Sequence, residues 1–305
     1  MNAEALQQPV IPDEVRSVAQ IIDWCAAQFE AADLYFGHGT DNARDEAAWL
    51  VANRIGYPFG EARLAEIPDA QTRAGIAQLL AERVRTRKPL AYLLNEAWFA
   101  GEAYYVDERV IVPRSPIAEL ILEGFAPWVE PQGVEQVLDL CTGSGCIAIA
   151  CAHALPRARV DAVDISAAAL EVAAINVARH GVGERVRLLQ GDLYAPVADR
   201  RYDIIVSNPP YVDSAEMAAR AAEYRHEPEL ALAAGEAGLD LAIPLIEQAR
   251  AHLNEQGILV LEVGASAPAL EARYPRLPFI WLDFEHGGEG VALLERAALD
   301  AYFSD

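Results

Sequence analysis

From about residue 132 onward, short apolar runs alternate with helical segments, and this alternation restricts the fold more than any other feature of the sequence. The runs typical of strands are Gln136–Leu140, Val160–Asp164, Val186–Leu189, Ile204–Ser207, Ile258–Val263, Phe279–Asp283 and Gly290–Leu294. Helical patterns fall between the earlier runs, for example at Ala167–His180 and Leu239–Leu253. Such alternation predicts a mostly parallel sheet with helices on both faces. Only a loop containing Glu285–Gly288 separates the last two runs, which predicts an antiparallel hairpin at the end of the sheet.

The first 95 residues follow a helical pattern instead. Apolar residues recur at helical spacing from Val15 to Phe29, and two further helices are expected at about 41–55, capped by Thr40 or Asp41, and at about 69–88. The basic end of the last helix suits the negative end of a helix dipole, with substrate contact as the alternative. Aromatic and β-branched residues from Trp98 to Val112 predict a β-hairpin. We therefore expect a helical domain at 1–95, a hairpin linker at 96–114 and an α/β domain at 115–305.

The composition is that of a globular protein. Of 305 residues, 53% are hydrophobic and 23% are charged, so a substantial core can be buried. No apolar run reaches the length of a membrane span, and the polar N-terminus lacks the pattern of a secretory signal, so we expect a cytoplasmic protein. The four cysteines form no C-x-x-C pair and are expected to be small buried thiols, and the six histidines show no metal-ligand spacing.

The net charge of −22 bears on the partner. A protein that binds nucleic acid needs basic residues to neutralise phosphates, so this charge opposes DNA or RNA as a substrate. An acidic surface attracts a basic protein, although it also serves general solubility, and composition does not separate these two roles.

The segment Asp139–Gly145 follows the first strand of the α/β domain and opens a helix. Its glycines allow a tight turn and a close approach to a ligand, and Gly143–Ala148 matches the G-x-G-x-x-A pattern of dinucleotide sites. Asp164, at the end of the second strand, is placed to bind ribose hydroxyls. These features predict a nucleotide-like cofactor and suit both NAD and S-adenosylmethionine.

Two more carboxylates favour S-adenosylmethionine. Asp139 precedes the turn, near the expected place of the cofactor's amino-acid part or its positive sulfonium. Asp192 follows the third strand, where its carboxylate can accept a hydrogen bond from the adenine amino group while Leu193 packs on the ring. An isolated aspartate is more often a cap or turn residue, so the weight of Asp192 comes from its position as the third acid at successive strand ends.

The stretch Asn208-Pro209-Pro210-Tyr211 follows the fourth strand and has the chemistry to hold a planar NH2 group. The Asn208 side-chain oxygen and a neighbouring backbone carbonyl can each accept one N–H, and the two prolines stiffen the loop. Tyr211 offers a flat apolar face. An ordinary turn at the end of a strand is the alternative, because Asn-Pro and Pro-Pro are common in turns.

Together, these segments resemble the protein-glutamine N5-methyltransferases of the HemK-like family. The resemblance covers nearly the whole chain and implies a seven-stranded, mostly parallel, Rossmann-like class I S-adenosylmethionine methyltransferase domain with a helical N-terminal domain and a β-hairpin linker. One bacterial branch acts on peptide-release factors and another on the large-subunit ribosomal protein L-three. The chain is similar to the second branch at Tyr35–Asn42 and Glu223–Glu229, and it departs from the pattern of the first branch at Val112–Pro116 and Cys141–Cys146.

The resemblance also implies residue roles. Asn208 and the Pro209 carbonyl bind the substrate amide, with Tyr211 completing the catalytic set and Pro210 and Arg114 also expected at the substrate. The residues expected around S-adenosylmethionine are Asp139, Cys141, Thr142, Gly143, Ser144, Gly145, Asp164, Ile165, Asp192, Leu193 and Asn208. The amide nitrogen is expected to attack the methyl carbon in line, without a strong base and without a metal. A basic ribosomal protein is the expected partner, with neither nucleic acid nor membrane required.

Four alternatives remain open from the sequence. Glutamine methylation of release factors uses the same site, and adenine-N6 methylation of nucleic acid shares the Asn208–Tyr211 chemistry but is opposed by the charge. A dehydrogenase that uses NAD leaves Asn208–Tyr211 and Asp192 without a role. An assembly protein without catalytic activity would use only the acidic surface.

The stretch from Val212 to Gly238 is long for a loop and predicts a lid or a binding element. Glu223, Glu227 and Glu229 within it either face a basic substrate or form a solvated acidic surface. Arg114 is expected to organise this loop, to bind the cofactor carboxylate or to form a structural ion pair.

Overall fold

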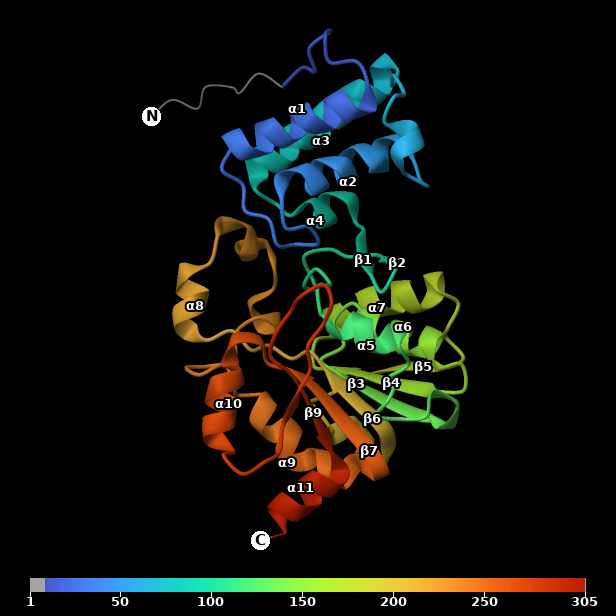
Figure 1. Ribbon diagram of the computed structural model, residues 1–305, viewed down its shortest axis with the longest axis vertical. Coiled ribbons are helices and arrows are strands. Elements are labelled where there is room, and N and C mark those ends of the chain that lie inside the picture. Colours follow the sequence, from blue (N-terminus) through green and yellow to red (C-terminus); the bar gives the residue numbers. More distant parts are fainter. Residues whose placement is uncertain (1–8, 305) are drawn as a thin grey trace. The chain divides into compact units, whose positions relative to one another are not determined.

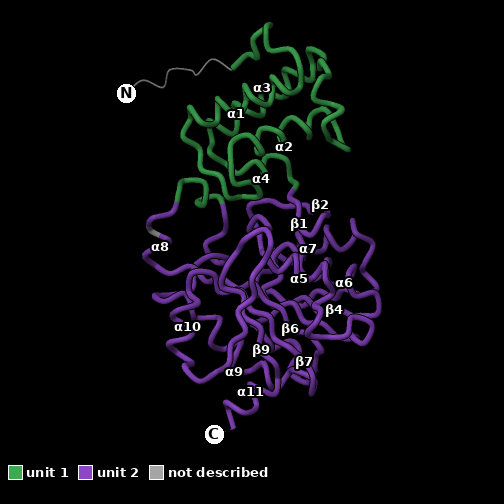
Figure 2. The backbone as a smooth tube through the Cα atoms, in the orientation of Figure 1, with its two compact units in different colours: residues 1–96, 221–226 green, residues 97–220, 227–305 purple. Residues whose placement is uncertain are grey.

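The computed structural model describes residues 9–304, apart from the side chain of Ala218 (Figure 1). The chain divides into two compact units (Figure 2). The first unit contains the residues up to Glu96 together with Ala221–His226, and the second contains Ala97–Arg220 and the chain from Glu227 onward. A segment that lies far along the sequence therefore belongs to the first unit.

The first unit is helical. Its helices are α1 (Val18–Ala31), α2 (Ala43–Ile55), α3 (Ala70–Thr86) and α4 (Leu90–Leu94), and a 3-10 turn, η1, spans Glu61–Arg63. The apolar stripe predicted from Val15 to Phe29 forms one side of the core, with Val18, Ile22 and Phe29 fully or almost fully buried. The N-cap of α2 is Asn42, one or two residues after the predicted caps, and its side chain accepts the backbone N–H of Asp45 at 2.9 Å.

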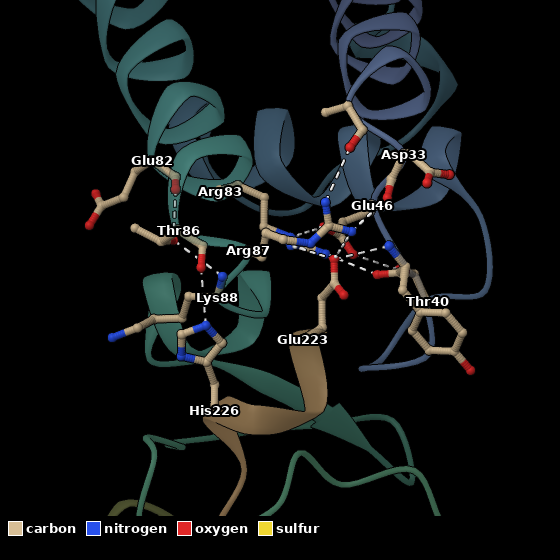
Figure 3. A network of polar contacts seen from close by, with 12 residues as sticks. Asp33, Thr40, Glu46, Glu82, Arg83, Thr86, Arg87, Lys88, Glu223 and His226 are labelled. Carbon is tan, nitrogen blue, oxygen red and sulfur yellow. Dashed lines mark hydrogen bonds and ion pairs between the residues drawn. The ribbon is translucent and has the colours of Figure 1, made fainter. Parts of the chain in front are cut away.

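A buried cluster of charges lies inside this helical unit (Figure 3). The Arg83 guanidinium on α3 donates to Glu46 on α2 at 2.6 Å and lies 3.8 Å from the carboxylate of Glu223. Glu223 comes from the 3-10 turn η4 (Ala222–His226) and accepts both the Arg87 guanidinium, at 2.8 Å, and the backbone N–H of Tyr35, at 3.1 Å. The side chains of Arg83, Glu46 and Glu223 are 0–2% exposed. Two cations and two carboxylates thus compensate one another, and only the Arg87 side chain, at 34% exposure, reaches water.

Figure 3 also corrects the interpretation of the basic end of α3. Arg83 and Arg87 do not simply face a helix dipole: they bind carboxylates, and they also donate to backbone carbonyls of the loop that follows α1, which include Tyr35 and Asp33. The pattern of residues along α3 could not indicate this pairing, because Glu223 lies 140 residues after Arg83 in the sequence.

The second unit is built on a seven-stranded sheet in the order β5-β4-β3-β6-β7-β9-β8. The strands are β3 (Gln136–Leu140), β4 (Arg159–Asp164), β5 (Val186–Gln190), β6 (Tyr202–Ser207), β7 (Leu253–Glu262), β8 (Ile280–Trp281) and β9 (Val291–Glu295). All pairs from β5 to β7 are parallel, whereas β9 pairs antiparallel with both β7 and β8. The predicted mostly parallel sheet and its antiparallel end are confirmed.

Alternate residues of the central strands point into two separate cores, as the two-residue period of a strand requires. One core contains Val137, Ile204 and Val260 and is covered by helices α5 (Ile117–Leu122), α6 (Cys146–Ala154) and α7 (Ala167–Arg179). The other contains Leu138, Ile205 and Leu261 and is covered by α9 (Ala242–His252), α10 (Ala267–Arg273) and α11 (Arg296–Phe303). The central strands read as continuous apolar runs because both of their faces are buried.

Shorter elements complete this unit. Strands β1 (Ala97–Phe99) and β2 (Glu102–Tyr104) pair antiparallel as the predicted hairpin, although Val110 and Ile111 fall outside any strand. The Val212–Gly238 stretch contains helix α8 (Ser214–Ala219) and the turns η4 and η5 (Glu229–Ala231), and two smaller turns, η2 and η3, span Pro131–Gly133 and Ala195–Val197; η6 spans Gly264–Ser266. All four cysteines are free thiols. None of the helices in the described part of the chain has the length and apolar character of a membrane span.

We predict that Glu223→Ala destabilises the helical unit by about 3–5 kcal/mol, because the change leaves the buried Arg83 and the partly exposed Arg87 with one carboxylate and removes the acceptor of the Tyr35 N–H. Amide hydrogen exchange of the intact chain should show lost protection in residues 221–226 and in α3, while α9 keeps its protection. Glu229→Ala, at an exposed position six residues away, is the matched control and should change stability by less than about 0.5 kcal/mol. Equal behaviour of the two variants would contradict the prediction.

Candidate active site

The turn after β3 is the first element of the site. Cys141, Gly143 and Gly145 all have positive φ angles, of 61°, 55° and 78°, so the chain turns sharply between β3 and α6. A Cβ on Gly143 would meet no atom within 4 Å, whereas a Cβ on Gly145 would lie 3.2 Å from Ala173 of α7. Gly143 therefore keeps the ligand side of the turn open, and Gly145 lets the turn pack closely on the neighbouring helix.

Asp139 holds this turn from behind. It lies within β3 with 0% exposure, and its carboxylate accepts the Thr142 hydroxyl and the backbone N–H of Ala148, the latter at 3.1 Å. Its second oxygen is buried without a hydrogen-bond partner among the described residues. Burial raises the pKa of Asp139 to about 7, an effect that these two hydrogen bonds only partly offset.

Asp164 connects the turn to β4. One carboxylate oxygen accepts the backbone N–H of Gly143 and the other accepts that of Ser166, both at 2.9 Å. Partial burial raises its pKa, which these backbone hydrogen bonds oppose. The backbone N–H of Gly191 donates to the Asp164 carbonyl at 3.0 Å and so brings the end of β5, with Asp192 and Leu193, alongside.

The Asn208–Tyr211 loop leaves β6 at the same edge of the sheet. Parallel pairing sets Ser207 opposite Leu140 of β3, and the Ser207 hydroxyl donates to the Leu140 carbonyl at 2.7 Å. Asn208 therefore starts beside the turn that follows β3.

These elements enclose a cavity of about 170 Å³ in the second unit. Its wall is mostly apolar, and two carboxylates, Asp164 and Asp192, line it. Arg109 is the only cation among the described residues of the lining, and Asp107 and Glu171 bind its guanidinium at 2.6 Å and 2.8 Å. Such a wall suits a flat base, ribose hydroxyls and a cationic centre; it lacks the free positive charge that a dinucleotide pyrophosphate favours. The residues fit S-adenosylmethionine better than NAD.

The structure brings together eight of the residues expected at the site. Those that line the cavity are Cys141, Gly143, Asp164, Ile165, Asp192, Leu193, Asn208 and Pro210. Asp139, Thr142, Ser144 and Gly145 shape the turn without lining the cavity, and Pro209, Tyr211 and Arg114 are also absent from its wall.

Sequence patterns missed the rest of the wall. Most of it comes from the stretch after the β-hairpin, from the region around η5 and from the residue before α9, through Arg109, Val110, Ile111, Pro228, Leu230, Ala231 and Leu241. The neighbours of Asp164 and Asp192, together with α7, supply Val163, Ser166, Ala169 and Gly191. The apolar character of Val110 and Ile111 suggested a strand, and nothing local indicated a ligand wall. Glu262, discussed below, was also missed, although a glutamate closing the apolar run of β7 is a visible signal.

The expectations for the acidic loop were wrong for two of its three glutamates. Glu223 and Glu227 neither face a substrate nor form a solvated surface, because both are buried and bind arginines. Glu227 receives the Arg114 guanidinium through two hydrogen bonds, at 2.6 Å and 2.8 Å, and the backbone N–H of Val112 at 3.0 Å. Arg114 thus organises this loop as a structural ion pair. Glu229 is exposed.

Comparison with known proteins agrees with this geometry. Residues 119–224 match the methyltransferase small domain. A methyltransferase structure from Pyrococcus furiosus aligns with 63% of this chain and 88% of its own, at 20% identity and a TM-score of 0.47. The sheet order and the matched domain define a Rossmann-like, S-adenosylmethionine-dependent methyltransferase.

Two curated proteins are much closer in sequence. The ribosomal protein uL3 glutamine methyltransferase of Bordetella pertussis is 46% identical over 94% of this chain and 97% of its own length. The protein of the same name from Burkholderia pseudomallei is 45% identical over 95% of this chain and 98% of its own. The chain belongs to the family of ribosomal protein uL3 glutamine methyltransferases, as the resemblance noted in the sequence predicted.

The raised pKa of Asp139 predicts a specific pH dependence. Between its unfolded value near 4 and its folded value of about 7, the folded chain holds a proton that the unfolded chain has lost. Relative to Asp139→Asn, whose amide does not titrate, the wild-type chain should lose up to about 1.4 kcal/mol of stability per pH unit over this window and then level off above pH 7. Chemical unfolding of both proteins from pH 4 to pH 9 measures this difference, and a pH-independent difference contradicts the assignment.

Proposed function

We propose that this enzyme transfers a methyl group from S-adenosylmethionine to the side-chain amide nitrogen, N5, of a glutamine in ribosomal protein uL3. The observation that carries the proposal is the placement of Asn208. It lies at the cavity wall beside the turn after β3 and comes directly from the end of β6. The names of the two curated relatives support uL3 as the substrate.

The proposed cofactor contacts follow from the cavity. Asp164 is placed for the ribose hydroxyls, Asp192 for the adenine amino group, and Leu193 and Ile165 for the faces of the base. Asp139 supports the turn from behind. When bound, S-adenosylmethionine supplies an electrophilic methyl group on a positive sulfur.

The chemical difficulty lies in the amide, whose nitrogen lone pair is delocalised. In the proposed mechanism, the Asn208 side-chain oxygen and the Pro209 carbonyl each accept one N–H of the glutamine and fix its orientation. The apolar wall beside them excludes water and strengthens these hydrogen bonds. The amide proton becomes acidic only as the new N–C bond forms, so no strong base has to remove it first.

The charge of the chain supports a basic protein partner. With a net charge of −22, the enzyme attracts a basic ribosomal protein and repels free nucleic acid. A ribosomal-protein substrate also favours the expected cytoplasmic location.

The substrate assignment predicts that labelled methyl groups pass from S-adenosylmethionine to purified uL3. Mass spectrometry should locate one added methyl group on a glutamine side chain. Peptide-release factors, DNA and ribosomal RNA, incubated in parallel, should remain unlabelled. Label in a release factor but not in uL3 would move the chain to the other branch of the family, and label in nucleic acid would replace the proposal.

The role of Asn208 predicts a separation of catalysis from cofactor binding. Asn208→Ala should lower kcat by about 100-fold or more, because the amide loses an orienting acceptor. Calorimetry should show a Kd for S-adenosylmethionine within a few-fold of the wild-type value. Asn208→Asp keeps one acceptor oxygen in the same position and serves as the isosteric comparison. Unchanged turnover of Asn208→Ala overturns the proposed role.

A further inference from the structure

Glu262 is a buried carboxylate for which the cavity gives no role. It ends β7 with 4% exposure, and parallel pairing of β7 with β6 sets it beside the start of the Asn208–Tyr211 loop. Its two oxygens bind two different segments. One accepts the Tyr211 hydroxyl at 2.9 Å and the other accepts the Ser115 hydroxyl.

The rest of Tyr211 is also held. The Ser266 hydroxyl donates to the Tyr211 carbonyl at 3.0 Å. A Cβ on Gly264 would lie 2.7 Å from the Tyr211 ring, and a Cβ on Gly238 would lie 2.2 Å from its carbonyl oxygen, so both positions require glycine for this close approach. Tyr211 is therefore fixed at its hydroxyl, its ring and its backbone.

This environment determines what Tyr211 can contribute. Burial and the Glu262 carboxylate both raise the pKa of the phenol, so it stays protonated and donates its hydrogen to Glu262. It does not act as a base. Its hydroxyl serves to fix the end of a loop whose beginning is fixed by the Ser207 hydroxyl on Leu140. Asn208, Pro209 and Pro210 lie between these two attachments.

We propose that Glu262 is a positioning residue for methyl transfer, which acts through Tyr211 to hold the two acceptors at Asn208 and Pro209 in place. The inference rests on the proposed function of that loop. A buried carboxylate is costly without compensation, and here its compensation comes from the hydroxyls of Tyr211 and Ser115 and from the nearby charge of Arg114. Glu262 thereby connects the Asn208–Tyr211 loop to the Val112–Pro116 segment, because Ser115 donates its hydroxyl to Glu262. Arg114, the residue before Ser115, binds Glu227.

The test compares variants that remove the contact with one that preserves it. Glu262→Ala and Tyr211→Phe should each lower kcat about 10- to 100-fold, because small displacements of orienting groups are costly in rate. The Kd for S-adenosylmethionine should stay within a few-fold of wild type, since neither residue lines the cavity. In Glu262→Gln, the amide oxygen can still accept the Tyr211 hydroxyl, and the amide NH2 can donate to the Ser115 hydroxyl oxygen. This variant should therefore keep kcat within about threefold of the wild-type value. The double variant Glu262→Ala/Tyr211→Phe should be no slower than the slower single variant.

A second tyrosine–glutamate pair in the same unit provides the control. The hydroxyl of Tyr274, which is 3% exposed, donates to Glu247 at 3.0 Å, and neither residue lines the cavity. Tyr274→Phe and Glu247→Ala should leave kcat unchanged. The proposal is wrong if kcat of the double variant falls by the product of the two single-variant factors, or if Glu262→Ala leaves kcat unchanged.

Amide hydrogen exchange separates this inference from the substrate assignment. Peptides that cover residues 204–214 should exchange faster in Glu262→Ala than in Glu262→Gln, with or without a substrate. If the wild-type enzyme fails to methylate uL3 but residues 204–214 still exchange faster in Glu262→Ala than in Glu262→Gln, the proposed function is wrong, whereas the role of Glu262 in positioning the loop is supported. If Glu262→Ala does not fold, Tyr211→Phe and Glu262→Gln still test the contact, and equal exchange in wild type and Tyr211→Phe contradicts it.

Discussion

The candidate site depends on the parallel register of β3 with its two neighbours. Leu140 pairs with Val163 of β4 and with Ser207 of β6, so the strands end at the same edge of the sheet. Asp164 and Asn208 follow directly from these ends, and the turn at Cys141–Gly145 lies between them. A shift of β6 by one residue would turn its side chains to the opposite faces and remove Asn208 from the cavity wall. The apolar residues that fix this register are therefore as necessary to the site as the polar ones.

Three of the segments that carry the family resemblance in the sequence, Tyr35–Asn42, Val112–Pro116 and Glu223–Glu229, make contacts within the unit to which their residues belong. Tyr35 donates its backbone N–H to Glu223, and the rings of His38 and Tyr224 lie 4.5 Å apart, both within the helical unit. Glu227, four residues after Glu223, binds Arg114, and both Glu227 and Arg114 belong to the second unit. Each of these segments was noted separately in the sequence. The structure gives them a common role, which is to fix the course of the stretch between Val212 and Gly238.

Sequence patterns predicted the sheet well because its central strands are buried on both faces and stand out as apolar runs. Cys141, Gly143, Asp164, Asp192 and Asn208 were predicted for a related reason, since residues at the carboxyl ends of neighbouring parallel strands meet at one edge of the sheet. The charge clusters were not predicted, because the arginines that bind Glu223, Arg83 and Arg87, lie 140 and 136 residues earlier in the chain. Val110, Pro228 and Leu241 were missed because an apolar wall residue has no local signal that distinguishes it from core.

The return of the chain at Ala221–His226 has a consequence for biosynthesis. When the first 96 residues have left the ribosome, Arg83 has Glu46 as a buried carboxylate partner, but the carboxylate that binds Arg87 in the final structure, that of Glu223, has not yet been made. The helical unit reaches its final charge balance only after more than half of the α/β unit has been synthesised. A gene fragment that ends at Glu96 therefore encodes an incomplete version of the first unit, which lacks the buried carboxylate of Glu223.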